Sequence, residues 1–294
     1  MKEKYGYLGP KGTFSEIAVL KYSKKDDELI YFKSIKEIID KLKKGKIDLG
    51  LIPLENSLEG SVNYSLDILY KENLWITGEI IIPVKQYLLV PDGLRIDQIK
   101  NIYSHPQAIA QSEELIHKYL ENAKIVYTES TAAAAQMLKN DIDAAMLGSK
   151  RIIDLYGYKV LAEQLDENFT RFIIVSDKKR GITKYERQKE YKSSLIISPN
   201  ENKPGILYKI LGEFAEKNID LTRIESRPTK KLLGEYLFYL DIAGHIDEPD
   251  ISNAIKNLEK NSSYFKILGT YIKDILKEGS IAKNVKSKNG WKLV

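Results

Sequence analysis

Five short polar clusters contain the residues whose types and spacing could do chemistry. They are Gly9–Ser15, Pro53–Ser57, Ser104–Gln107, Ser130–Ala133 and Asn168–Phe172. They supply hydroxyl, amide and carboxyl groups, and three of them stand where a helix is expected to begin and where free N–H groups can bind an anion. The set predicts a site for a small anionic organic acid whose reaction needs orientation and only mild acid assistance.

Each cluster taken alone has a plainer explanation. Gly9–Ser15 matches neither a dinucleotide fingerprint nor a P-loop, and a capped strand-to-helix turn accounts for it. Turn chemistry is the alternative for Pro53–Ser57, and an N-cap followed by a close helix–sheet contact is the alternative for Ser130–Ala133. His105 is either a proton donor or a helix-capping imidazole. Arg171 is either a carboxylate partner or a surface residue.

The residue types that the chain lacks exclude other chemistries. The 294 residues include no cysteine, so disulfides, thiolate metal ligands and a cysteine nucleophile are excluded together. The three histidines, His105, His117 and His245, lie far apart in the sequence, which argues against a histidine-built zinc site. We therefore expect no metal site built from these residues.

Composition and charge are those of a globular protein without nucleic-acid or membrane partners. The chain is 43% hydrophobic and 30% charged, with a net charge of +5. Residues 177–192 and 277–294 each carry +4, so the rest sums to about −3. A charged linker and a basic tail explain this better than a nucleic-acid-binding face. With no visible signal peptide or membrane span, we expect a cytoplasmic protein.

The first 177 residues alternate strands and helices, which predicts an α/β domain with mostly parallel sheets covered by helices on both faces. Thr13–Glu16 and Ser34–Glu37 each have the capping-box pattern of a helix start. The predicted strands and extended segments are Lys4–Leu8, Ile47–Leu54, Trp75–Val90, Asn101–Ser104, Lys124–Thr128, Asp143–Leu147 and Arg171–Val175. Further helices are predicted over 106–120, 130–139 and 149–156.

The segment after the charged run has a different rhythm. A strand at Leu195–Ile197, a helix from Pro204 to Lys217, and two strands near 222–227 and 235–243 are followed by a helix and a strand. The order is βαββαβ, which is the ferredoxin-like α+β arrangement. This segment is expected to be a separate, smaller domain.

The clusters resemble the motifs of prephenate dehydratases, in that family's order. The matching strings are GPKGTFSE, PLENSLEGSV, SHPQAIAQ, STAAAAQML and NFTRF, and together they span nearly all of residues 4–176. The second domain is similar to the ACT domain that the family carries. There Asn202–Leu207 resembles the glycine-bearing effector motif, and Glu225–Pro228 resembles the ESRP motif.

The resemblance implies a two-lobed, periplasmic-binding-protein-like catalytic domain at 1–177, with one lobe at about 1–76 plus 165–177 and the other at 77–164. Hinges are expected near 75–80 and 160–168. A charged linker at 178–192, an ACT regulatory domain at 193–272 and a basic tail at 277–294 complete the expected organisation. The tail has no structure or role assigned from sequence.

The implied activity is the decarboxylative dehydration of prephenate to phenylpyruvate, on the route to phenylalanine, without a cofactor. The implied catalytic residues are Thr170, Arg171 and Phe172, with Thr170 as donor to the departing hydroxyl. The implied substrate-binding residues are Thr13, Glu55, Asn56, Ser57, Ser104, Gln107, Ser130 and Thr131.

The ACT resemblance further implies allosteric control by phenylalanine in a homodimer or homotetramer with paired ACT domains. The implied effector-binding residues are Asn202, Pro204, Gly205, Ile206, Leu207, Glu225, Ser226 and Arg227. Two alternatives remain open at this point. One is arogenate dehydratase, whose substrate carries an amino group in place of the keto group, and the other is a non-catalytic amino-acid sensor.

Overall fold

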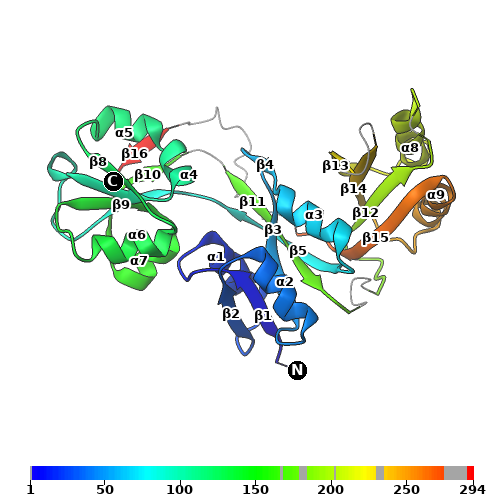
Figure 1. Ribbon diagram of the computed structural model, residues 1–294, viewed down its shortest axis with the longest axis horizontal. Coiled ribbons are helices and arrows are strands. Elements are labelled where there is room, and N and C mark those ends of the chain that lie inside the picture. The colour runs from blue at the N-terminus through cyan, green and yellow to red at the C-terminus, as the bar shows by residue number, and fades with distance from the viewer. Residues whose placement is uncertain (1, 166–167, 179–183, 202, 230–234, 275–289) are drawn as a thin grey trace. The chain divides into compact units, whose positions relative to one another are not determined.

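The computed structural model describes residues 2–165, 168–178, 184–201, 203–229, 235–274 and 290–294 (Figure 1). These residues form two compact units. The first unit holds the described residues of 1–62, 80–172 and 276–294, and the second holds those of 63–79 and 173–275. The division runs through two strands, β5 and β11. Residues 63–79, which the predicted first domain includes, therefore pack in the same compact unit as the ACT-like segment.

One sheet has the strand order β2-β1-β3-β11-β5, with β4 paired to β3. Its strands are β1 (Lys4–Leu8), β2 (Glu28–Phe32), β3 (Leu49–Asn56), β4 (Gly60–Ser61), β5 (Trp75–Pro83) and β11 (Phe169–Ser176). β1 pairs in parallel with both β2 and β3. Helices α1 (Phe14–Tyr22) and α2 (Ile35–Lys43) pack on β1 and β3.

Both predicted helix starts are capped by a hydroxyl side chain. The Thr13 hydroxyl accepts the Glu16 N–H, and the Ser34 hydroxyl accepts the Glu37 N–H. The reciprocal half of the capping box differs from the prediction, because each glutamate reaches one residue further back. Glu16 accepts the backbone N–H of Gly12 and not that of Thr13. The carboxylate thereby holds the glycine turn as well as the helix end.

A second sheet lies in the first unit and has the order β16-β10-β6-β9-β7-β8. Its strands are β6 (Tyr87–Val90), β7 (Asn101–Ser104), β8 (Lys124–Tyr127), β9 (Ala144–Gly148), β10 (Lys159–Gln164) and β16 (Trp291–Leu293), and a short 3-10 helix, η1, covers Ile96–Gln98. β7 pairs in parallel with β8 and β9, whereas β6 pairs antiparallel with β9 and β10. The sheet is therefore mixed.

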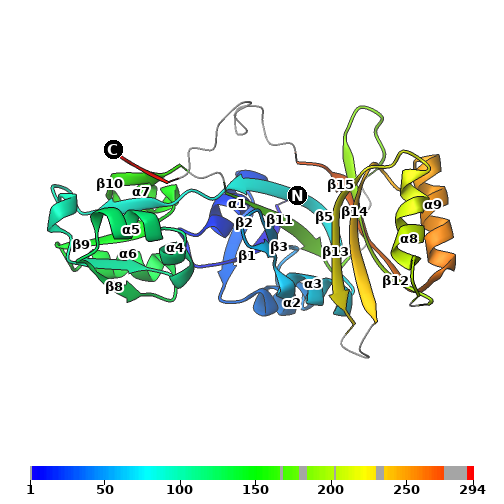
Figure 2. The same ribbon diagram turned by 90° about the horizontal axis from the view of Figure 1, so that it is seen from above.

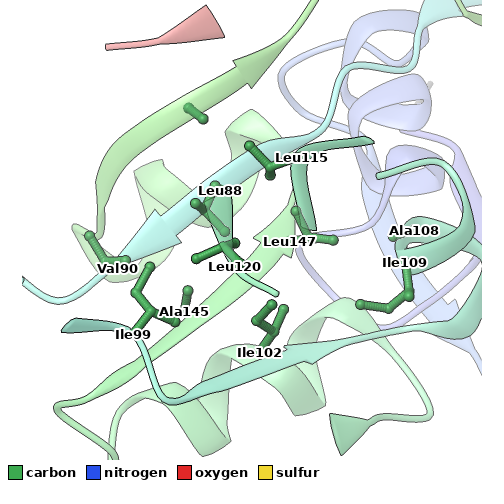
Figure 3. Close-up of a cluster of buried hydrophobic side chains, with 11 residues drawn as sticks. Leu88, Val90, Ile99, Ile102, Ala108, Ile109, Leu115, Leu120, Ala145 and Leu147 are labelled. Carbon is green, nitrogen blue, oxygen red and sulfur yellow. The ribbon is translucent and has the colours of Figure 1, made fainter. Parts of the chain in front are cut away.

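Helices cover both faces of this second sheet. They are α4 (Pro106–Ala110), α5 (Glu113–Tyr119), α6 (Thr131–Leu138) and α7 (Lys150–Tyr156). Figures 1 and 2 place α4 and α5 on one face and α6 and α7 on the other. The two faces carry separate apolar clusters, of which Figure 3 shows the one beneath α4 and α5, with Leu88, Ile102 and Leu147 from the strands and Leu115 from α5.

The structure corrects several sequence-based boundaries. The predicted helix 106–120 is two helices, α4 and α5, separated at Gln111 and Ser112. The first predicted hinge is placed too early, because β5 continues the first sheet to Pro83 and β6 begins the second at Tyr87. The chain returns from the second sheet to the first between the end of β10 at Gln164 and the start of β11 at Phe169, close to the second predicted hinge at 160–168. Strands β2 and β10 and helix α3 (Asn63–Lys71) were not predicted.

The end of the basic tail is a strand. β16 pairs antiparallel with β10, with Trp291 opposite Gln164 and Leu293 opposite Ala162. The Trp291 side chain packs against the apolar cluster of Figure 3. The Leu165 N–H also donates to the Gly290 carbonyl, at 2.9 Å. A short edge strand is stable here because it adds a large aromatic side chain to an existing core.

The second unit contains the predicted βαββαβ order. Its elements are β12 (Tyr191–Pro199), α8 (Ile206–Ala215), β13 (Leu221–Pro228), β14 (Tyr236–Ala243), α9 (Pro249–Lys260) and β15 (Ser262–Ile272). The antiparallel sheet has the order β13-β14-β12-β15, and α8 and α9 cover one face of it (Figure 2). β12 begins at Tyr191, so the last two residues of the predicted linker belong to the sheet.

The other face of this sheet packs on α3 and on the first part of β5. Lys192 of β12 forms an ion pair with Glu79 of β5 at 2.8 Å, and both side chains are buried. The Tyr239 hydroxyl donates to the Leu66 carbonyl of α3 at 2.9 Å. Removing one partner of such a buried pair leaves an uncompensated charge, which makes the contact intolerant of single changes.

Lys266 of β15 donates to the carbonyl oxygens of Leu69 and Glu72, at the end of α3, at 2.8 and 2.6 Å. Burial lowers the pKa of Lys266 to about 8, and the nearby charge of Glu72 only partly opposes this.

No helix among the described residues combines the length and the apolar composition needed to cross a membrane.

The partly buried ammonium group of Lys266 predicts a pH-dependent stability. In the folded chain the group loses its proton near pH 8, and in the unfolded chain near its ordinary value. Between these values the unfolded chain holds more protons, so raising the pH favours the folded state, by up to about 1.4 kcal/mol per pH unit.

We expect Lys266→Met to remove this contribution. Urea unfolding of wild type and variant at several pH values above 7.5 should give free energies of unfolding that diverge in favour of wild type as the pH rises. Parallel curves would contradict the shifted titration.

Candidate active site

A cavity of about 390 Å³ lies within the first unit. Its wall comes from the β1–α1 turn, the loop between β3 and α3, the starts of α4 and α6, and the segment that enters β11. All five polar clusters contribute to this wall. The predicted site residues that line it are Thr13, Asn56, Gln107, Ser130, Thr131 and Thr170.

Thr170 stands in this wall with a defined hydrogen-bond geometry. Its side chain is 9% exposed, and its Oγ1 accepts a hydrogen bond from Asn56 Nδ2 at 2.9 Å. The other end of the Asn56 amide is fixed, because Oδ1 accepts the backbone N–H groups of Leu58 and Glu59. Since Asn56 uses Oγ1 as an acceptor, the hydroxyl hydrogen of Thr170 remains available for donation into the cavity.

Ser57 holds the segment that precedes Thr170. Its hydroxyl accepts the Phe169 N–H at 2.9 Å and donates to Asn168 Oδ1 at 3.2 Å. Its backbone N–H also donates to the Phe169 carbonyl. Ser57 does not line the cavity itself. It acts on the wall indirectly, by fixing the entrance of β11.

Arg171 and Phe172 are held inside the structure. Arg171 is 4% exposed, and its Nη1 forms an ion pair with Glu55 Oε1 at 3.0 Å. Phe172 is 2% exposed. Neither these side chains nor Glu55 line the cavity. The carboxylate that Arg171 contacts is therefore one of the protein's own, and the ion pair ties the end of β3 to β11.

The cluster at the start of α4 is divided between the wall and the interior. His105 lines the cavity, and its Nδ1 accepts the Gln107 N–H, so the imidazole caps the helix. Ser104 is 1% exposed and lies outside the cavity wall. Its hydroxyl finds no hydrogen-bond partner among the described residues.

Seven polar residues of the wall were not predicted as catalytic or substrate-binding residues: Ser15, Glu59, Gln86, His105, Gln111, Glu129 and Asn168. Gln107 and Gln111, four residues apart along the chain, both donate to Glu59 Oε1, at 2.6 and 3.1 Å. The two glutamines of SHPQAIAQ are four residues apart, and this spacing could have predicted that Gln111 lies on the same side as Gln107. No sequence pattern distinguished Gln86, whose place follows from the passage between the two sheets.

The wall contains no positive side chain among the described residues. Its charged members are Glu59 and Glu129. An anion in this cavity would therefore be held by neutral N–H and O–H donors, including those at the starts of α1 and α6, which Thr13 and Ser130 cap. The described residues include no group of three His, Cys, Asp or Glu that could hold a metal ion.

The sequence comparisons agree with this arrangement of motifs. The family model of prephenate dehydratases matches residues 5–180, and that of ACT domains matches residues 200–260. The chain belongs to the prephenate dehydratase family. The prephenate dehydratase of Methanocaldococcus jannaschii is 38% identical over 90% of this chain and 96% of its own length. The resemblance seen in the motifs is confirmed.

Solved structures give the same result for the fold. The prephenate dehydratase of Arthrobacter aurescens, solved in complex with L-Phe, has a TM-score of 0.80 at 33% identity and covers 92% of this chain and 90% of its own. GqqA, described as a novel type of quorum-quenching acylase, also reaches 0.80, at 26% identity, with 92% and 98% covered. Both the α/β fold and the ACT domain of this family are thus present.

The glycine turn before α1 is held from two sides. Ser149 Oγ donates to the Gly12 carbonyl at 2.7 Å, and Arg151 contacts the same Glu16 carboxylate that accepts the Gly12 N–H. Gly12 has φ +93°, and a Cβ there would lie 2.3 Å from Ile152 Cδ1. Only glycine satisfies both the backbone conformation and the contact.

We expect Gly12→Ala to destabilise the chain by about 1–3 kcal/mol more than Gly45→Ala. Gly45 also has a positive φ, of +63°, but open space around its Cβ position, so it is the matched control for backbone strain. Thermal unfolding measures the difference. Equal losses of stability in the two variants would show that Ile152 moves aside at no cost in free energy.

Proposed function

We propose that this chain converts prephenate to phenylpyruvate, water and CO2. The family membership supports this activity, and the cavity's set of neutral donors suits a substrate with two carboxylates. The bond to the ring carboxylate breaks and leaves its electron pair in the ring. The bond to the ring hydroxyl then breaks with its pair, and the departing oxygen takes a proton to become water. Aromatisation drives the reaction, so no electron carrier is required.

The observation that carries the proposal is the hydroxyl of Thr170 in the cavity wall, with its oxygen occupied by Asn56 and its hydrogen available. Its role is to donate a hydrogen bond to the departing hydroxyl, where negative charge develops. The proton that completes the water molecule comes ultimately from solvent. Positioned donors of this kind contribute about 10²–10⁴ in rate.

The remaining site residues bind or position. Ser130 and Thr131, with the backbone N–H groups at the starts of α1 and α6, contact the carboxylates of the substrate, and Gln107 donates from α4. Thr13 holds the start of α1, because its hydroxyl accepts the Glu16 N–H and donates to the Pro10 carbonyl at 3.0 Å. Asn56 orients Thr170. The buried residues are positioning residues, because they fix β3 against β11 without reaching the cavity: Glu55, Ser57, Arg171 and Phe172. Ser104 has no role in this proposal.

Substitution of Thr170 tests the mechanism. Thr170→Ala should keep the fold and lower kcat by about 10²–10³, whereas Thr170→Ser should stay within about tenfold of wild type, because it keeps the donor. Phenylpyruvate is followed by its absorbance in alkali. Near-normal turnover by the alanine variant would remove Thr170 from the mechanism.

The same assay separates the alternative functions. Faster turnover of arogenate than of prephenate would indicate an arogenate dehydratase. Binding without turnover of either acid would indicate a sensor.

We further propose that phenylalanine binds the ACT domain and alters the activity. Gly205 caps α8 with φ +84°, which presents free N–H groups to a carboxylate, and Ile206 lines two hollows of the second unit. Pro204, Leu207, Glu225 and Ser226 remain candidate effector contacts. Asn202 lies outside the described residues.

Arg227 has a different role in this proposal. Its guanidinium contacts Asp67 at 3.2 Å and also Asn63, both in α3. α3 begins at the residue after Val62, which belongs to the cavity wall. Arg227 is thus a link between the effector motif and the segment that carries the substrate loop, and not an effector ligand.

Asp67→Asn tests this link, because it weakens the ion pair and leaves the ACT motifs intact. We expect phenylalanine to bind with a dissociation constant within about threefold of wild type by calorimetry, while its effect on turnover shrinks. Lost binding would make the Arg227 region part of the effector site. An unchanged effect on turnover would exclude the link.

In the assembly we propose, two ACT domains pair in a homodimer or homotetramer in the cytoplasm. β13 is an edge strand, and one of its apolar side chains, Ile224, is 45% exposed. Such an edge suits pairing with a second copy. Sedimentation velocity of the full chain, with and without phenylalanine, measures the assembly size.

A further inference from the structure

The amide of Asn168 is the unexplained group in the cavity wall. Asn168 precedes β11, lines the cavity and is 1% exposed. Its Nδ2 has no hydrogen-bond partner among the described residues. A buried N–H donor left unpaired is costly, so its place beside a cavity calls for an acceptor there.

The orientation of this amide follows from Ser57. The Ser57 hydroxyl accepts the Phe169 N–H, so its single hydrogen is free to donate, and it donates to Asn168 Oδ1. The reverse orientation would place a second donor on the Ser57 oxygen and leave that hydrogen without this acceptor. Nδ2 is therefore the end without a protein partner. The backbone is fixed as well, because the Val84 N–H donates to the Asn168 carbonyl at 2.7 Å.

The spacing to Thr170 indicates which part of a ligand the amide would meet. Asn168 and Thr170 are two residues apart and both line the cavity. Along extended chain this separates their Cα atoms by about 7 Å. That length is comparable with the separation between oxygens on opposite carbons of a six-membered ring. With the departing hydroxyl at Thr170, Asn168 would lie near the carbon that bears the ring carboxylate.

We propose that Asn168 Nδ2 donates a hydrogen bond to the ring carboxylate of the substrate, the group that leaves as CO2. This inference rests on the proposed dehydratase function. A neutral donor suits the step, because the carboxylate must give up its charge to the ring as the carbon–carbon bond breaks. A buried cation would stabilise that charge and oppose its release. The described part of the wall contains no such cation.

Asn168→Asp tests the contact most directly. The introduced carboxylate can still accept the Ser57 hydrogen, but it replaces the donor by a negative charge facing the ring carboxylate. We expect the KM for prephenate at pH 7 to rise at least tenfold, since a hydrogen bond to a charged group is lost. Inhibition by phenylpyruvate, which has no ring carboxylate, should change much less.

The pH dependence separates this role from a structural one. Burial and the facing substrate carboxylate raise the pKa of the introduced carboxyl above its ordinary value. Lowering the pH from 7 towards 5 should therefore bring the KM of Asn168→Asp back towards that of wild type, because protonation removes the introduced charge and restores an O–H donor. Asn168→Ala is the second variant, for the case that the first does not fold. It should raise the KM by a smaller factor, with no pH dependence of its own.

Ser112→Ala is the matched control. The Ser112 hydroxyl is also buried and without a partner among the described residues, but it does not line the cavity, so its loss should leave KM unchanged. An unchanged KM in a folded Asn168 variant would overturn the inference, and so would equal losses of affinity for prephenate and phenylpyruvate. A wild-type chain that does not turn over prephenate would instead overturn the dehydratase function itself.

Discussion

The site depends on one hydrogen bond, from Asn56 at the end of β3 to Thr170 near the start of β11. A threonine hydroxyl can donate or accept, and a catalyst of hydroxide departure needs it to donate. Because the Asn56 amide is itself fixed by two backbone N–H groups, it can only donate to Thr170. In the proposed mechanism, the direction of the hydrogen bond from Thr170 is thus set by a turn in the neighbouring loop, without any strong acid.

The second constraint is electrostatic. The described wall of the cavity includes two glutamates and no cation. A dianion must therefore bind there through many weak donors, each of them placed by a helix start or a strand end. In the proposed reaction, such donors bind the substrate and leave its charge able to move into the ring. The one buried arginine near the site, Arg171, is neutralised by Glu55. In the proposed mechanism, Arg171 fixes β3 against β11 and does not contact the substrate.

The sequence predicted the five clusters, the two fold classes and the place of Thr170 in the cavity, because strand ends and helix starts leave local patterns. It did not predict which polar residue of a cluster faces the cavity. Ser57 and Asn168 illustrate this. Ser57 was expected in the wall, but it lies behind the wall and holds the side chain of Asn168, which lines the cavity. β16 was also missed, because a three-residue strand has no periodicity, and its stability comes from the packing of Trp291.

That last strand has a consequence for the order in which the molecule can form. Residues 291–293 complete the edge of the second sheet, yet they follow the whole ACT segment along the chain. During translation, the edge of β10 stays uncovered until residues 291–293 have been synthesised, well after β10 itself. Contacts so distant in sequence form slowly, and a nascent chain would meet cellular chaperones with this edge open.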